Sequence, residues 1–146
     1  MFLAETNPLN ASALIFPVLE CFHIVGFALS VGTIAIVDFR LLGWTMQRQT
    51  VAEVANDLAP WTVIGLACIL LSGPLMFSSD PDMYYLNPSF QVKMVCFVLA
   101  LILNYTIHRK VTRADGSAGL GKLVAVVSLL LWVGVVFGGI FIAFTT

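Results

Sequence analysis

The sequence predicts an all-α integral membrane protein: one domain, residues 1–146, folded as a four-helix up-down bundle with both termini outside, on the periplasmic side. Three observations carry this prediction. The chain is 60% hydrophobic and only 10% charged, whereas a soluble domain is about 25% charged. Four apolar runs are long enough to cross a bilayer. Lys and Arg gather in two of the loops. A soluble enzyme with a water-facing surface is therefore excluded.

The apolar runs predict spans over residues 12–37, 61–77, 90–107 and 120–144. The first run is too long for a signal peptide, and no Lys or Arg precedes it, so we expect a retained helix. Pro60 suits the first turn of the second helix, where the missing N–H of proline costs nothing. The loop over residues 40–59 has apolar residues at helical spacing, which predicts a short interfacial helix there.

The positive charges set the expected orientation. Two loops hold six of the seven Lys and Arg residues, namely Arg40, Arg48, Arg109, Lys110, Arg113 and Lys122. Lys93 alone lies on the other side of the bundle. Under the positive-inside rule these two loops face the cytoplasm. The sequence therefore predicts a multi-pass protein of the bacterial inner (cytoplasmic) membrane.

Polar residues form a stripe along the first span. Glu20 and His23 lie one helical turn apart in an apolar run. At 100° per residue, Asp38 points in the same direction as Glu20, and His23 and Ser30 lie on one flank of that line. An ionisable group at membrane depth costs about 2.5–3.5 kcal/mol on insertion scales, so it usually has a partner or a role. We expect the stripe to face the bundle interior, because lipid cannot satisfy it.

The third span carries a matching stripe of Lys93, Asn104 and His108, which lie within about 60° of one another on a helix. Glu20 and Lys93 fall in the outer half, so we predict a buried ion pair between them, with His23 beside it. His108 lies roughly 20 Å deeper than His23 by helix rise. Two histidines of one chain are therefore not expected to ligate the same haem iron.

Several functions remain open for the polar site in the outer half. Glu-x-x-His can supply metal ligands from one helix face, but Glu20 is the only acid well within a span, which disfavours a di-metal centre. A single copper or zinc ion could use Glu20, His23 and Met76. Haem b is favoured over copper, since His23 with Gly26 beside it supplies half of a membrane haem site. The alternatives are a proton or ion pathway through Glu20, His23 and Lys93, or a purely structural subunit with buried polar bonds.

Catalysis has little support in the sequence. No hydrolase triad, phosphate loop or Walker motif occurs, so we assign no catalytic residue and do not favour an enzyme. We expect a binding or accessory membrane protein, with haem- or metal-linked electron transfer as one interpretation.

Gly134 and Gly138 form a GxxxG pattern that permits close packing within the chain or in a homo-oligomer. The expected partners are lipid and a second copy or a larger membrane complex, and a net charge of −1 gives no indication of nucleic acid.

One combination of residues resembles an uncharacterised bacterial family of small four-span membrane proteins, a domain of unknown function. The residues that carry the resemblance are Glu20-Cys-Phe-His23-Ile-Val-Gly26, Gly32, Asp38-Phe-Arg40-Leu-Leu-Gly43, Gly65, Gly73, Asn87-Pro-Ser-Phe90-Gln-Val-Lys93 and Asn104. It covers nearly the whole chain and implies no known activity. A looser similarity to copper-resistance D proteins and to b-type cytochrome membrane domains rests on hydropathy and on histidine placement, which is fold-level analogy.

Overall fold

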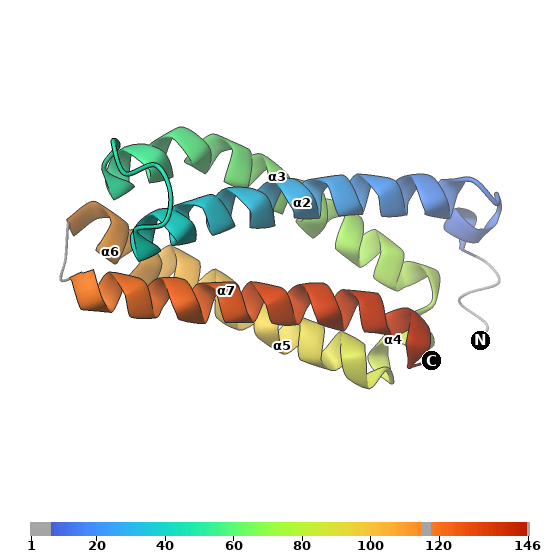
Figure 1. Ribbon diagram of the computed structural model, residues 1–146. Helices are drawn as coiled ribbons and strands as arrows, with labels where there is room; N and C mark the ends of the chain where they lie inside the picture. Colours follow the sequence, from blue (N-terminus) through green and yellow to red (C-terminus); the bar gives the residue numbers. More distant parts are fainter. Residues whose placement is uncertain (1–6, 115–117, 146) are drawn as a thin grey trace.

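The computed structural model describes residues 7–114 and 118–145 of the chain, and these form helices and turns without any strand. Among the described residues, four helical segments are long and apolar enough to cross a membrane. Their cores are α2 (Ile15–Leu42), α3 (Val51–Ser79), α5 (Pro88–Leu103) and α7 (Ala118–Phe141). The four segments run up and down, and the start of α2 and the end of α7 lie at the same end of the bundle (Figure 1). The predicted four-helix architecture is confirmed.

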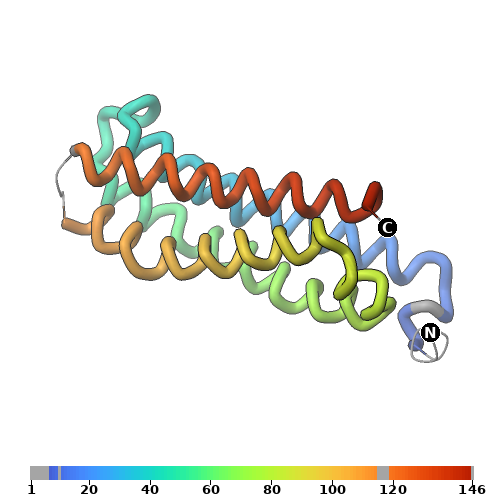
Figure 2. The backbone as a smooth tube through the Cα atoms, turned by 90° about the horizontal axis from the view of Figure 1, so that it is seen from below, coloured from blue at the N-terminus to red at the C-terminus, as the bar shows by residue number. Residues whose placement is uncertain are grey.

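The helices pack as two pairs. α2 lies along α3, α7 lies along α5, and α2 joins the pairs by packing on α7. Figure 2, seen at right angles to Figure 1, shows the same antiparallel arrangement from below. Short 3-10 turns, η1 (Pro8–Asn10) and η3 (Ile142–Phe144), precede α2 and follow α7 at the termini end. The pairing leaves a seam between α3 and α5, and both cavities described below open along it.

The second span begins ten residues earlier than predicted. Thr50 and Glu53 form a capping box: the Glu53 N–H donates to Thr50 Oγ1 at 3.2 Å, and the Thr50 N–H donates to Glu53 Oε2 at 2.7 Å. This box satisfies two free backbone donors and starts the helix at Val51. The predicted interfacial helix is thus the first part of α3. Pro60 lies inside α3, and its placement in the first turn was wrong.

The third span is also longer than predicted. Asn87 caps α5 by accepting the N–H groups of Ser89 and Phe90 at 2.9 and 3.3 Å. The helix then continues through the π-helix η2 (Asn104–His108) into α6 (Arg109–Ala114). The connection before it contains the short helix α4 (Pro81–Tyr85), which is capped by Asp80. The helix therefore passes residue 107, where the prediction ended it.

Glycines let the helices of each pair approach closely. A Cβ added at Gly65 of α3 would lie 2.6 Å from the backbone nitrogen of Ser30 and 2.7 Å from the carbonyl oxygen of Gly26 on α2. In α7, a Cβ at Gly138 would lie 2.9 Å from Lys93 Cβ. The GxxxG pattern of the last span therefore packs on α5 within the chain.

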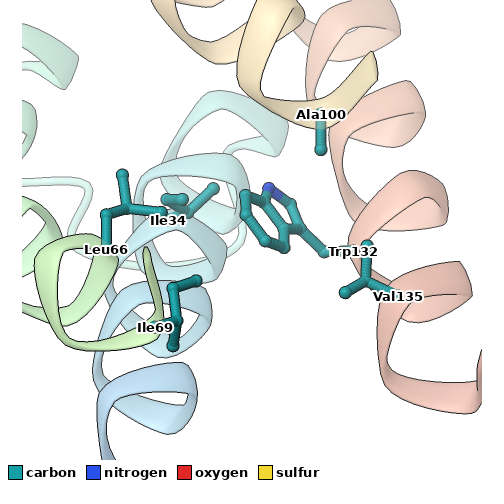
Figure 3. Close-up of a cluster of buried hydrophobic side chains, with 6 residues drawn as sticks. All are labelled: Ile34, Leu66, Ile69, Ala100, Trp132 and Val135. Atoms are coloured by element: carbon teal, nitrogen blue, oxygen red, sulfur yellow. The ribbon is translucent and has the colours of Figure 1, made fainter. Parts of the chain in front are cut away.

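The hydrophobic core sits at mid-bundle and is drawn in Figure 3. Its buried members are Ile34, Leu66, Ile69, Ala100, Trp132 and Val135. The Trp132 ring extends from α7 toward Ile34 (Figure 3) and packs edge-on against Phe27 and Phe97, with ring centroids 6.5 and 6.1 Å away. We call this group the central cluster. It lies between the two cavities, since Ile34 lines one and Ile69 and Val135 line the other.

Candidate functional site

A cavity of about 440 Å³ lies between α3 and α5 toward the termini end, and we call it the His23 pocket. Its wall is mainly aromatic and aliphatic, with Phe27, Phe77, Phe90 and Phe97 among its members. The lining side chains with polar groups are His23, Tyr84, Tyr85 and Lys93. Apolar pockets of this size with a few convergent polar groups are typical of small-molecule and cofactor sites.

A chain of hydrogen bonds fixes the His23 ring. Ser72 Oγ donates its one proton to the Cys68 carbonyl oxygen at 2.6 Å. Ser72 Oγ must then accept from His23 Nδ1, which lies 2.7 Å away. A neutral imidazole carries only one proton, so Nε2 keeps its lone pair. Among the described residues Nε2 has no hydrogen-bond partner, and the ring lines the pocket.

Lys93 lines the same pocket from α5. Its stem packs on α7, where a Cβ at Gly139 would lie 3.7 Å from Lys93 Nζ. In the described part of the chain, no carboxylate or other side chain pairs with the ammonium group. The Lys93 charge acts electrostatically on His23. The structure thus brings His23 and Lys93 together, as predicted, around one cavity.

Glu20 does not join them. Its side chain is exposed on the outside of the bundle, it does not line the pocket, and no described residue forms an ion pair with it. The predicted buried pair with Lys93 is therefore wrong. The start of α2 reaches past the end of α7 (Figures 1 and 2), and the buried residues of α2 begin only at Gly26.

Glu20 still acts on the pocket at a distance, through Tyr84 of α4. The Tyr84 hydroxyl lies outside the spans in a buried position. Burial raises the pKa of this hydroxyl, and the negative charges of Glu20 and Asp80 raise it further. Tyr84 therefore stays a neutral group in the lining of the His23 pocket.

The sequence predicts that Gly26 makes room for a ligand beside His23, and this prediction is wrong. A Cβ at Gly26 would lie 2.5 Å from Cys68 Cβ, so this glycine serves the contact between α2 and α3. Gly73 is the glycine beside the ring: a Cβ there would lie 3.6 Å from His23 Cε1. Sequence spacing alone did not indicate Gly73, because it lies on a different helix from His23.

A second polar site lies at the opposite end of the bundle. The His108 Nε2–H donates to Asp38 Oδ1 at 2.8 Å, and Ser128 Oγ donates to Asp38 Oδ2 at 2.6 Å. Asp38 is 0% exposed and His108 is 5% exposed. The prediction that Asp38 and His108 face the interior is confirmed. Ser128 was missed, although it is the one hydroxyl residue between Lys122 and Thr145 of the last span.

A smaller cavity of about 210 Å³ adjoins this second site, and we call it the His108 pocket. It lies between the first half of α3 and the η2–α6 segment, and Asn104 and His108 both line it. His23 and His108 therefore line different cavities, with the central cluster between them. In the described ranges, no three His, Cys, Asp or Glu side chains gather as a metal site.

Comparison with known proteins adds a family and no activity. The model of DUF6644, a family of unknown function, matches residues 13–145. No curated protein and no solved structure matches the chain. The looser similarity to copper-resistance D proteins and b-type cytochromes thus gains nothing from these comparisons. The family match spans both pockets and all four membrane helices, and the chain therefore belongs to DUF6644, a family of unknown function.

Proposed function

We propose that this protein is a membrane-embedded electron-transfer subunit that would hold haem b in the His23 pocket, with His23 as a ligand to the iron. The single observation that carries the proposal is the His23 ring, which lines an apolar cavity with its Nδ1–H bound by Ser72 and its Nε2 without a hydrogen-bond partner among the described residues. Histidines that ligate metals commonly donate their other ring N–H to a neighbouring acceptor, which fixes the tautomer and the ring direction. Haem, when bound, supplies one-electron exchange.

The rest of the pocket fits a planar apolar group with acidic substituents. Aromatic side chains line the wall, and the ammonium of Lys93, without a partner among the described residues, would pair with a haem carboxylate. Met76 and Met94 also line the pocket, and the thioether of either would be a second ligand to the iron beside His23. With a methionine as the second ligand, the site would not need a second histidine at the depth of His23.

The direct test is an absorption spectrum of the purified protein, followed by titration of the haem-free protein with hemin. We expect a Soret band that forms on titration and is lost in His23→Ala. Gly32→Ala is the matched control, because a Cβ there meets nothing within 4 Å. If hemin does not shift the spectrum of the wild-type protein, or if His23→Ala binds it equally well, the proposal fails.

A proton or ion pathway is the second candidate, favoured by the fully buried Asp38 and its partner His108. Buried titratable pairs inside a bundle are the usual components of proton relays. The central cluster stands between this pair and His23, so a pathway would need Trp132 to move. Flux into liposomes with wild-type protein, Glu20→Gln and Asp38→Asn would test it, and absent or unchanged flux argues against transport.

The proposed location follows from the positive charges. We place the protein in the bacterial inner membrane, with the His108 end in the cytoplasm and the His23 end in the periplasm. The lipid-facing helix surfaces then leave room for a second copy or a larger membrane complex to exchange electrons at the His23 pocket. Cleavage by an impermeant protease at an epitope fused after Thr146 would test the orientation, since protection from outside would contradict it.

A further inference from the structure

The His108 pocket is a built cavity with polar groups on two of its walls. Eight of its lining side chains can donate or accept hydrogen bonds, and they include Asn56, Asn104, His108, Arg109 and Arg113. On the α3 side, Ala52, Ala55 and Ala59 line it with small side chains, so the space between α3 and α6 stays open. This cavity is separate from the His23 pocket and plays no part in the function proposed above.

The π-helix η2 forms one wall of the cavity. A π-turn takes up an extra residue, and such turns are frequent at functional sites. Here the turn runs from Asn104 to His108, and both of these residues line the cavity. The irregular backbone thus ends at the residue that contacts Asp38, and the wall of the pocket is set by that contact.

His108 offers one ring nitrogen to the cavity. Its Nε2–H is held by Asp38 at 2.8 Å, and the second oxygen of Asp38 is held by Ser128. Nδ1 has no hydrogen-bond partner among the described residues, although the side chain is only 5% exposed. Among the described residues, the one fully buried side-chain nitrogen or oxygen without a partner is Trp132 Nε1, so His108 Nδ1 reaches accessible space. Because His108 lines the cavity, a ligand there would meet Nδ1.

The lining charges are positive. Arg109 and Arg113 lie four residues apart, on one side of α6, and both line the cavity. In the described part of the chain neither guanidinium group has a hydrogen-bond or ionic partner. The acidic side chains at the start of α3 do not oppose them, since Glu53 is bound within the capping box at Thr50 and Asp57 does not line the cavity.

We propose that the His108 pocket binds a phosphate-bearing anion between Arg109, Arg113 and His108. Guanidinium groups match phosphate oxygens with paired N–H donors, and Asn104 and Asn56 supply neutral donors beside them. With the ring proton on Nε2, His108 Nδ1 is an acceptor, so the P–OH group of a singly protonated phosphate donates to it. The phosphate could belong to a lipid headgroup at the membrane surface or to a soluble compound, and the chemistry of recognition is the same. The experiment separates these two sources.

The test uses the haem-free protein in detergent, at constant ionic strength, with melting temperature as the readout. Ligands that bind the folded state raise that temperature. The probes are inorganic phosphate, phosphatidic acid, and diacylglycerol with the same acyl chains as the phosphatidic acid. Stabilisation by inorganic phosphate identifies a soluble ligand. Stabilisation by phosphatidic acid, without any by diacylglycerol or inorganic phosphate, identifies a lipid headgroup.

The variants decide whether the site is the one proposed. Arg109→Gln with Arg113→Gln should weaken binding at least about tenfold, since hydrogen bonds to charged groups are the strong ones. Lys110→Gln is the control: it removes one positive charge from the same helix, against two in the double variant, and Lys110 does not line the cavity. Arg113→Lys keeps the charge and loses the paired donors, so it should also bind more weakly.

The proposal is overturned if neither phosphate probe stabilises the wild-type protein, or if Lys110→Gln weakens binding as much as the double variant. Because no haem is present, this outcome is independent of the function proposed for the His23 pocket.

Discussion

His108 Nε2 lies 2.8 Å from Asp38 Oδ1 across 70 residues of sequence, and both side chains are buried. This contact ties the π-helix after α5 to the last turns of α2, while Ser128 ties the same carboxylate to α7. Three of the four membrane segments therefore meet at one carboxylate. Removing one member of such a buried pair leaves the other without compensation, which is more costly than removing both.

Asp38→Ala should destabilise the protein by about 3–5 kcal/mol, because it leaves His108 and Ser128 buried without their acceptor. Thermal unfolding in detergent, followed by circular dichroism, gives the measurement. Asp57→Ala, an exposed acid on α3, is the control and should change stability by less than about 0.5 kcal/mol. In a double-mutant cycle with His108→Ala, the two losses should add up to clearly more than the loss in the double variant. Additive losses would contradict the coupling.

The contact between α2 and α3 predicts a contrast between two glycines. In Gly65→Ala the new methyl group meets the Ser30 backbone nitrogen at 2.6 Å, and backbone cannot move aside as a side chain can. We expect a loss of about 1–3 kcal/mol or more from overpacking. Gly32→Ala meets nothing within 4 Å and should leave stability unchanged or slightly higher. Equal melting temperatures for the two variants would refute the close helix approach.

Glu20→Gln should leave the melting temperature nearly unchanged, within about 0.5 kcal/mol of the wild-type stability, because the exposed carboxylate has no ion-pair partner among the described residues. This reverses the expectation from sequence, in which loss of Glu20 would leave Lys93 buried and unpaired. Chemical unfolding of the two proteins side by side is the measurement. A loss of several kcal/mol in Glu20→Gln would restore the predicted ion pair.

The comparison of sequence with structure shows what helical periodicity can predict. It correctly placed Asp38 and His108 inside the bundle, because each lies on the polar side of a long apolar helix. It failed for Glu20, which has the same helical direction as Asp38 but lies before Gly26, where the buried residues of α2 begin. Direction around a helix follows from residue spacing, whereas the end of a neighbouring helix depends on the tertiary fold. For the same reason Ser72 and Gly73, which contact His23 from α3, could not be identified from spacing within one span.

Ser72→Ala should weaken haem binding by about 10- to 100-fold, because partners of a ligating histidine typically contribute that much to affinity. The fold should persist, since the Cys68 carbonyl that loses the Ser72 proton lies within a continuous helix. Hemin titration followed at the Soret band gives the affinity. Ser128→Ala, which removes a buried serine hydroxyl at the opposite end of the bundle, is the control and should bind hemin like the wild-type protein. Equal affinity for Ser72→Ala and wild type would remove the orienting role from Ser72.

Lys93→Met should separate stability from binding. Methionine keeps the unbranched stem that packs on Gly138 and Gly139, and it removes a half-buried charge that has no partner among the described residues. The haem-free protein should therefore be as stable as the wild type or more stable, because replacing a poorly solvated charge by an apolar group of similar volume is often stabilising. Haem affinity should fall by at least about tenfold, since a charge-assisted hydrogen bond to the haem carboxylate is lost. Lys93→Arg keeps the charge and should retain most of the affinity. If Lys93→Met binds hemin as well as the wild type does, Lys93 does not contact the haem carboxylate. A higher melting temperature in that variant would then show only that the unpaired charge had destabilised the protein.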